Sequence, residues 1–236
     1  MNKYKVGERI FFCLCIYVLL YDIFLIETYF VVVVVVMFFE LKHPSTCLVV
    51  GPTQAGKSFL VRQMIRENIY GSKIKRVKWC YLYPPKWMHE EPEIEFIRGL
   101  PTTFETGDLI ILDDHMHRLN EKVAEIFTVV SHQCDISVIL LLQNLFPRNA
   151  VMRDISLNSH YIILFKNSRD KAQFSYFGRQ LYPENTKYFV DAYIKATKKE
   201  YSYLVVDLHP QTKEEHRLRG SLFPTPEGIY WLYLPQ

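Results

Sequence analysis

The segment GPTQAGKS, at residues 51–58, constrains the fold of this chain more than any other feature. Two glycines in the spacing Gly-x-x-x-x-Gly-Lys-Ser let the backbone turn tightly, so that successive amide N–H groups point inward at phosphate oxygens. In this pattern Lys57 reaches the β and γ phosphates of a nucleotide, and Ser58 offers its hydroxyl to Mg²⁺. The segment therefore predicts a loop that binds polyphosphate through Gly51, Pro52, Thr53, Gln54, Ala55, Gly56, Lys57 and Ser58.

The residues on either side of this segment support the prediction, because such a loop has meaning only between a strand and a helix. Residues 46–50 are rich in β-formers. After Lys57, apolar residues recur at helical spacing, and these are Leu60, Val61, Met64 and Ile65. The N-terminus of that helix adds partial positive charge beneath the phosphates. A Gly-rich turn with a lysine beside it by chance is the alternative, and both flanks disfavour it.

A continuous apolar run that ends in two acids, DLIILDD at residues 108–114, predicts a second part of the site. Such runs are typical of strands in a parallel sheet that is buried on both faces, where ligands bind at the carboxyl ends of strands. We expect Asp113 to hold Mg²⁺, directly or through water, and Asp114 to polarise the attacking water as a general base. Acids also follow strands simply because loops are polar, but an adjacent pair downstream of a phosphate loop favours the functional interpretation.

The run DISVILLLQN, at residues 135–144, predicts another buried strand that ends in amides. Gln143 at this strand end would lie near the γ-phosphate, where an amide can orient water. The alternative is an amide that merely ends the strand. Between the two runs, Asn120 is a candidate N-cap for a helix, followed at helical spacing by Val123, Ile126, Phe127 and Val130.

The order of these elements indicates the fold class. We expect a strand at residues 77–83 before the acidic strand, a connection at residues 90–95, further strands at residues 161–165 and 203–208, and helices within residues 171–197. The predicted fold is therefore α/β: a P-loop NTPase of the RecA-like type with an additional strand and a catalytic acid, its mainly parallel sheet flanked by helices. The chain has no D-x-x-G after Asp113, no N-K-x-D and no LSGGQ-like segment, which argues against a GTPase and an ABC transporter subunit. A small-molecule kinase and a motor-type ATPase remain, and the strand order favours the motor.

Composition adds few constraints on function. The 236 residues suit one α/β domain, and a net charge of +3 is too small to indicate nucleic-acid binding. Five cysteines without a C-x-x-C pair suggest neither a zinc site nor a disulfide framework, which favours reduced thiols inside a cell. His115 and His117 beside acidic residues are candidate metal ligands, but spacing places no third ligand, so we interpret them as loop residues.

The first 40 residues predict an extension separate from the ATPase domain at residues 41–236. Residues 10–39 are almost wholly apolar and follow three basic residues, which is typical of a signal anchor or membrane helix. Asp22 and Glu27 are costly near the centre of a bilayer, however, and residues 31–36 are a run of valines typical of a repetitive coding tract. Residues 10–39 can therefore be interpreted as a membrane segment or as a spurious extension. In the second interpretation the protein begins at Met37.

Four segments resemble the DNA-packaging ATPases of the FtsK/HerA superfamily, in the branch of poxviruses, other large DNA viruses and Maverick/Polinton elements. These segments are HPSTCLVVGPTQAGKSFL, LIILDD, ILLLQN followed by FPRN, and NSHYIILFKNSRD. The first two contain the Walker A and Walker B motifs, which many ATPases share. Many relatives have Asp-Glu at the acidic pair, where this chain has Asp113 and Asp114.

The resemblance implies a motor that uses ATP and Mg²⁺ to move double-stranded DNA into a capsid. It also implies a homo-oligomeric ring, a hexamer or pentamer, that meets portal or vertex proteins at sites of virion assembly in the host nucleus or cytoplasm. Residues 10–39 would make any membrane contact. Rings of this kind place an arginine against the γ-phosphate of the next subunit. Arg148 and Arg169 are the candidates, and Arg169 is favoured.

Two other functions stay open from the sequence. A helicase or chromosome-partitioning pump of the same superfamily would share the chemistry but have different partners. A membrane-anchored nucleotide switch would depend on the apolar N-terminal segment. A basic cluster is a candidate site of contact with DNA phosphates, and it consists of Lys73, Lys75, Arg76 and Lys78. Such clusters are more often a solvated face of the protein.

Overall fold

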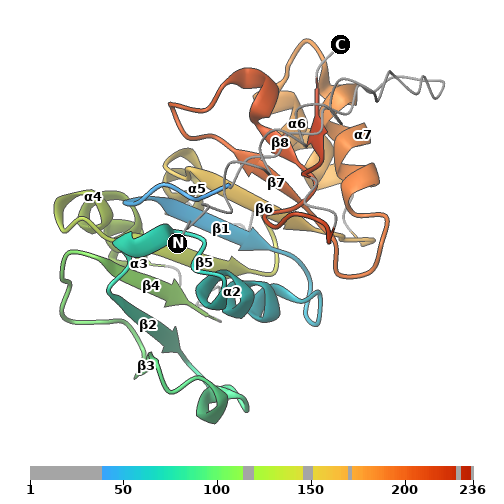
Figure 1. Ribbon diagram of the computed structural model, residues 1–236. Coiled ribbons are helices and arrows are strands. Elements are labelled where there is room, and N and C mark those ends of the chain that lie inside the picture. The colour runs from blue at the N-terminus through green and yellow to red at the C-terminus, as the bar shows by residue number, and fades with distance from the viewer. Residues whose placement is uncertain (1–38, 114–119, 146–150, 170–171, 227–229, 235–236) are drawn as a thin grey trace, which may run out of the picture. The chain divides into compact units, whose positions relative to one another are not determined.

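One mixed β-sheet organises the chain in the computed structural model, which describes residues 39–113, 120–145, 151–169, 172–226 and 230–234. Its described strands are β1 (Thr46–Val50), β2 (Arg76–Tyr81), β3 (Ile94–Arg98), β4 (Asp108–Leu112), β5 (Ser137–Leu142), β6 (Tyr161–Phe165), β7 (Tyr203–Asp207), β8 (Leu218–Arg219) and β9 (Leu232–Tyr233). Their order across the sheet is β3-β2-β4-β5-β1-β6-β7-β8-β9 (Figure 1). The strands from β3 to β6 in this order pair in parallel, and β7, β8 and β9 join antiparallel.

The central strands are buried at every residue, which explains their apolar sequences. β1, β4, β5, β6 and β7 have no exposed position. Strands covered on both faces need apolar side chains in both directions, so their sequences are continuous apolar runs instead of alternating patterns. The predicted strands at residues 161–165 and 203–208 are confirmed almost to the residue.

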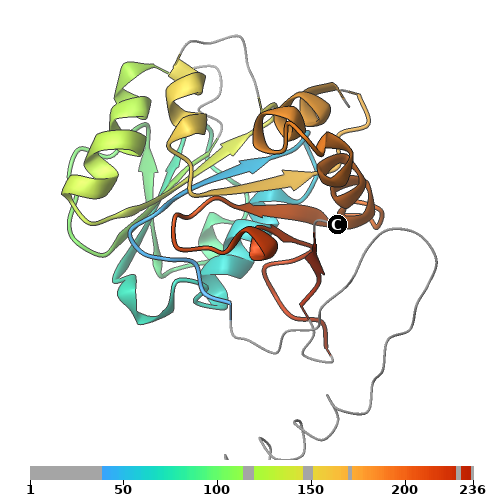
Figure 2. The same ribbon diagram turned by 90° about the horizontal axis from the view of Figure 1, so that it is seen from above.

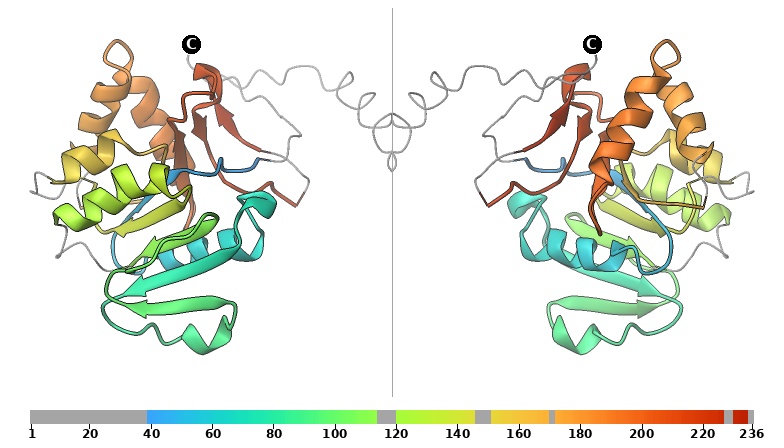
Figure 3. Two further views of the ribbon diagram at one scale, coloured as in Figure 1. Left: turned by 90° about the vertical axis from the view of Figure 1, so that its left-hand side faces the viewer. Right: turned by 90° about the vertical axis from the view of Figure 1, so that its right-hand side faces the viewer.

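Helices cover both faces of this sheet. They are α2 (Lys57–Arg66), α3 (Glu121–Glu125), the π-helical turn η4 (Ile126–Val130), α4 (Ser131–Gln133), α5 (Val151–Leu157), α6 (Ala172–Leu181) and α7 (Thr186–Ala196). Figures 2 and 3 show α2 on one face and α3 to α7 on the opposite face. The predicted N-cap is confirmed, because the Asn120 side chain accepts a hydrogen bond from the backbone N–H of Val123 at 3.2 Å. The predicted helices within residues 171–197 correspond to α6 and α7.

The face beneath α2 forms one continuous apolar core. The buried side of α2 consists of Leu60, Val61 and Met64, as its helical spacing predicts. These side chains pack in one cluster with residues of β1, β4, β5, β6 and β7, among them Val49, Ile111, Ile139, Ile163 and Val205. Burial of this stripe fixes the helix, and therefore the loop before it, against the ends of the strands.

Strand order bears directly on the predicted class of fold. β5 lies between β1 and β4, with Val50 opposite Leu142 on one side and Leu112 opposite Leu140 on the other. β1, the strand that precedes the phosphate loop, is therefore separated from the acidic strand β4 by an additional strand. This arrangement confirms the predicted RecA-like sheet, which sequence order alone did not establish.

Two expectations about the β2–β3 region need correction. Residues 90–95 were expected to be a connection, but the chain re-enters the sheet at Ile94 as the edge strand β3, whose exposure varies from residue to residue. Pairing with β2 supplies the backbone hydrogen-bond partners of β3, which the local sequence does not indicate. The strand expected at residues 77–83 runs from Arg76 to Tyr81 and stops before Pro84, which cannot donate to a ladder.

Most of the predicted extension at residues 1–40 lies outside the described residues, so the membrane segment stays a prediction. Within the described ranges, no helix has the length and apolar character needed to cross a membrane. The described thiols, Cys47, Cys80 and Cys134, are free.

Candidate functional site: a phosphate loop at the strand ends

The loop at residues 51–58 joins the carboxyl end of β1 to the first turn of α2, as predicted. Its first glycine continues the sheet, because the Gly51 N–H donates to the Leu142 carbonyl at 3.0 Å. A Cβ at Gly51 would lie 2.6 Å from Cβ of buried Phe165, so only glycine fits there. Gly56 has φ of 99°, a left-handed conformation that glycine adopts without strain, and it forms the N-cap of α2. Both glycines of the motif are therefore required by geometry.

Lys57 lies across this loop. Its Nζ donates to the carbonyl oxygens of Gly51 at 2.7 Å and Pro52 at 3.0 Å, so the ammonium group is held over the loop by the loop's own backbone. Ser58, the next residue, is half-buried in the first turn of α2. A positive charge, a helix N-terminus and a hydroxyl group thus occur within two residues, which is the combination that polyphosphate binding uses.

Asp113 follows β4 immediately, at the same edge of the sheet as the loop. Its backbone N–H donates to the Cys80 carbonyl at 2.9 Å, which continues the ladder with β2. Its Oδ2 accepts a hydrogen bond from the indole Nε1 of Trp79 at 3.2 Å, and Trp79 is fully buried. The carboxylate is therefore oriented by a rigid donor on the neighbouring strand. Asp114, the predicted general base, lies outside the described residues, so its role stays a prediction.

Gln143 lies between the loop and the acidic strand. It follows Leu142, which pairs with Val50 and accepts the hydrogen bond from Gly51. Since β5 separates β1 from β4, a side chain at its end has the loop on one side and Asp113 on the other. The fold thus brings Lys57, Ser58, Asp113 and Gln143 to one edge of the sheet, although they are spread over 87 positions of the chain.

Arg169 is exposed in the segment after β6, the other neighbour of β1. Its backbone N–H donates to Oδ1 of Asn167 at 3.0 Å. Asn167 is itself buried, and its N–H donates to the Tyr193 hydroxyl at 3.0 Å, which in turn donates to the Phe165 carbonyl at 3.1 Å. A fixed backbone with an exposed guanidinium is compatible with a contact to another subunit. Arg148, the other candidate, lies outside the described residues.

Half of the basic cluster suggested as a DNA track is unsuited to that role. Lys78 is buried, and its Nζ contacts the Asp108 carboxylate at 2.7 Å and the Thr103 carbonyl at 2.9 Å. Arg76 pairs with Asp108 at 2.7 Å and with Glu105 at 2.7 Å. Asp108 is wholly buried, and although burial raises its pKa, hydrogen bonds from Lys78 and Arg76 lower it more. Lys78 is therefore enclosed in the fold, and the charge of the partly exposed Arg76 is balanced by two carboxylates.

Sequence reasoning missed the aromatic support of the site. Trp87 in the β2–β3 connection packs edge-on against Trp79 with ring centroids 4.7 Å apart, and the guanidinium of Arg62 lies 4.4 Å above the Trp87 ring. Arg62 belongs to α2, so the chain of contacts runs from Asp113 through two tryptophans to the helix of the phosphate loop. No local signal identifies these residues, because their partners lie on other elements.

The donor set at this edge suits magnesium. A carboxylate at Asp113 and a hydroxyl at Ser58 are the hard oxygen ligands that Mg²⁺ takes together with nucleotide phosphates. Among the described residues, no cluster of three His, Cys, Asp or Glu side chains could hold a metal ion by itself. His115 and His117 lie outside the described residues.

Comparison with solved structures supports the fold. Two solved structures of one protein share it: the genome packaging NTPase B204 from Sulfolobus turreted icosahedral virus 2 in complex with AMP, and the same NTPase in complex with AMPPCP. Each is 14% identical to this chain, covers 72% of this chain and 95% of its own length, and has a TM-score of 0.51. No protein-family model matches the sequence, and no curated protein matches it. Fold and loop together define a P-loop NTPase of the additional-strand type.

Proposed function

We propose that this protein is an ATP-hydrolysing motor that translocates double-stranded DNA and packages a viral or virus-like-element genome into a capsid. The observation that carries the proposal is the convergence of the phosphate loop, Asp113 and Gln143 at one edge of a sheet in which β5 separates β1 from β4. A loop alone indicates phosphate binding. An acid and an amide beside it supply what hydrolysis of the bound phosphate needs.

Each residue of the site has a distinct role in the proposed hydrolysis of ATP. Backbone N–H groups of the loop and the Lys57 ammonium hold the phosphates, and Lys57 exchanges its two carbonyl contacts for phosphate oxygens. Gln143 orients the attacking water, and Asp114 accepts its proton as the oxygen attacks the γ-phosphorus and the bond to the β–γ bridging oxygen breaks. Mg²⁺, held by Ser58 and Asp113, would neutralise the developing negative charge.

The DNA-packaging role is supported by two independent likenesses. The sequence resembles packaging ATPases of the FtsK/HerA superfamily, and the fold is similar to that of a genome packaging NTPase. We further propose a homo-oligomeric ring, a hexamer or pentamer, that acts inside a cell at sites of virion assembly and meets portal or vertex proteins. Exposed Arg169 would face the nucleotide of the adjoining subunit and stabilise the transition-state charge.

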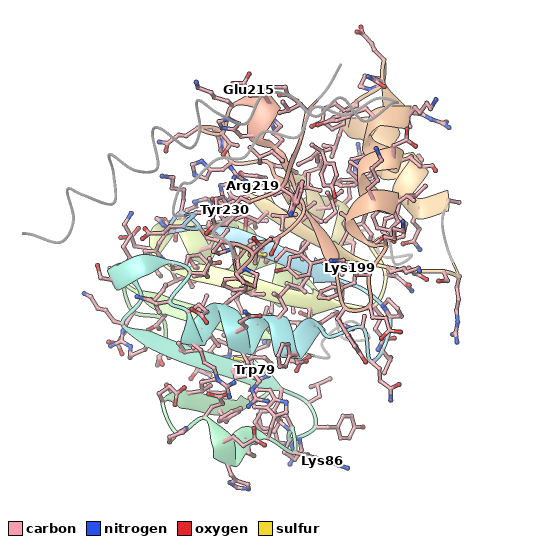
Figure 4. All side chains as sticks on the ribbon, turned by 45° about the vertical axis from the view of Figure 1, so that its right-hand side comes forward. Trp79, Lys86, Lys199, Glu215, Arg219 and Tyr230 are labelled. Atoms are coloured by element: carbon pink, nitrogen blue, oxygen red, sulfur yellow. The ribbon has the colours of Figure 1, made fainter. Side chains whose placement is uncertain are left out.

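ATP turnover with and without duplex DNA tests this proposal. We expect the wild-type protein to hydrolyse ATP and to be stimulated by DNA, and we expect Lys57→Ala and Asp114→Asn each to lower turnover at least about 100-fold. Lys86→Ala is the matched control for Lys57→Ala, because Lys86 is an exposed lysine outside the loop (Figure 4). If the wild-type protein does not hydrolyse ATP, the proposed ATPase activity is refuted. If DNA does not change the rate of ATP hydrolysis, the proposed DNA motor is refuted.

A further inference from the structure

An exposed tyrosine lies directly beside the phosphate loop. Tyr201 belongs to the turn at residues 199–202 between α7 and β7, and 70% of its surface is exposed. Ser202 closes the turn, because its hydroxyl donates to the Lys199 carbonyl at 2.6 Å. Tyr201 has φ of 59°, a left-handed conformation that non-glycine residues rarely adopt. The turn thus holds a large ring at the surface in an uncommon backbone conformation.

The Tyr201 ring lies beside the loop at its second glycine. A Cβ built on Gly56 would lie 3.3 Å from Cδ1 of Tyr201 and 3.8 Å from its Cβ. Phe165, buried beneath the loop, is the other neighbour at this position, with Cε1 at 3.6 Å. Figure 1 shows the α7–β7 turn beside the loop that joins β1 to α2, and Figure 4 marks Lys199, the first residue of the turn. The ring therefore lies next to Gly56 while most of the Tyr201 surface stays accessible.

The topology places this ring at the end of the site away from the catalytic groups. Asp113 and Gln143 follow β4 and β5, on one side of β1, so the reacting γ-phosphate points to that side. The triphosphate of a bound nucleotide is an extended chain with the γ-phosphate at one end and the nucleoside at the other. The nucleoside is therefore expected on the other side of β1. That side consists of β6 and β7, and Tyr201 lies two residues before β7 begins.

We propose that Tyr201 stacks on the base of the bound nucleotide. This inference rests on the nucleotide binding put forward under the proposed function and adds a second contact region to it. Base–aromatic stacking uses the π-face that every base presents, so it strengthens nucleotide binding without selecting one base. An accessible ring beside the phosphate loop suits this contact, since stacking needs a free face and a fixed position.

Binding of ATP and of inorganic tripolyphosphate to the full chain separates the two parts of the site. Tyr201→Gly removes the ring without straining the turn, because glycine adopts positive φ freely. We expect this variant to bind ATP about 10- to 100-fold more weakly than the wild type and to bind tripolyphosphate equally well. Tyr201→Phe keeps the ring and should bind ATP within about twofold of the wild type. Tyr83→Gly, which removes another exposed tyrosine, is the matched control and should leave both affinities unchanged.

Each contrary outcome has a distinct meaning. Unchanged ATP affinity in Tyr201→Gly overturns the stacking proposal and leaves the proposed ATPase function intact. Equal weakening of ATP and tripolyphosphate also overturns it, because the ring would then only support the loop. If the wild-type protein binds neither ATP nor tripolyphosphate, the proposed ATPase function itself is contradicted. GTP should follow ATP in every variant, since stacking tolerates any base, and a loss confined to ATP would contradict a stacking contact.

Discussion

At the scale of single residues, His160 illustrates how the edge of the sheet opposite the loop depends on protonation. The Thr46 backbone N–H donates to His160 Nδ1 at 3.2 Å, which requires this nitrogen to be unprotonated. Burial, with smaller contributions from the charges of His209 and His132, lowers the pKa of His160 to about 4. The rings of these histidines lie 5.4 and 5.7 Å from that of His160. The fold therefore favours neutral His160.

This pKa shift predicts loss of stability in mild acid. The folded pKa of about 4 lies below the ordinary value of 6.5, so the unfolded chain binds the proton first as pH falls. The stabilising contribution is present above pH 6.5 and is lost as pH falls toward 4. After allowing for partial exposure, we expect the free energy of unfolding to fall by about 1–2 kcal/mol between pH 7 and pH 5. Urea unfolding at both pH values measures it.

His160→Asn is the variant that isolates this effect. The asparagine carbonyl oxygen can accept from the Thr46 N–H but does not titrate, so the dependence on pH should flatten. His43 and His209 also have lowered pKa values because of burial, and they contribute in the same direction in both proteins. A slope equal to that of the wild type would assign the acid sensitivity to those residues instead.

At the scale of elements, an ion-pair cluster joins α2 to the β2–β3 connection. Glu91 is buried and accepts hydrogen bonds from Arg62 Nε at 2.7 Å and from Arg66 Nη2. Burial raises the pKa of Glu91, but the hydrogen bonds from Arg62 and Arg66 lower it more, so the carboxylate is ionised. Glu90 also contacts Arg62, at 2.6 Å, but its side chain is 62% exposed. The helix of the phosphate loop is thus anchored to the segment that carries Trp87.

The two neighbouring glutamates should differ sharply in their contribution to stability. Glu91→Ala leaves two guanidinium groups without their buried partner, and we expect it to lower the free energy of unfolding by about 2–4 kcal/mol. Glu90→Ala removes an ion pair whose acidic partner is solvent-exposed, and it should cost less than about 1 kcal/mol. Thermal or urea unfolding of both variants gives the comparison. Equal losses would show that the cluster does not anchor α2 through Glu91.

Elements also show which parts of the fold can be predicted from sequence. The central strands and α2 were predictable because burial demands apolar runs or stripes that appear in the local sequence. β3 was not, because an edge strand with varying exposure lacks that pattern and takes its definition from pairing with β2. The roles of Trp79 and Tyr201 could not be predicted either, because they depend on Asp113 and Gly56, which are distant in the sequence.

At the scale of the whole molecule, the proposed ring can be tested through Arg169. If this residue acts on the nucleotide of the adjoining subunit, Arg169→Ala should lower DNA-stimulated turnover at least about 100-fold. Mixing Arg169→Ala with Lys57→Ala subunits should restore part of the activity, because some interfaces then pair an intact loop with an intact arginine. Two inactive proteins that stay inactive when mixed, while both still assemble, would exclude action between subunits.

The sequence by itself determined the chemistry that this chain offers: a phosphate loop, an acid pair, an amide and the apolar runs that build a parallel sheet. These features are local, since each depends on residue types within about ten positions of one another. Tertiary structure decided what lies beside what. It placed β5 between β1 and β4, enclosed Lys78 beside the buried Asp108, paired the partly exposed Arg76 with the same carboxylate, and set Tyr201 beside Gly56. Such contacts join segments distant in the chain, and strand pairing and burial select them only when the sheet forms.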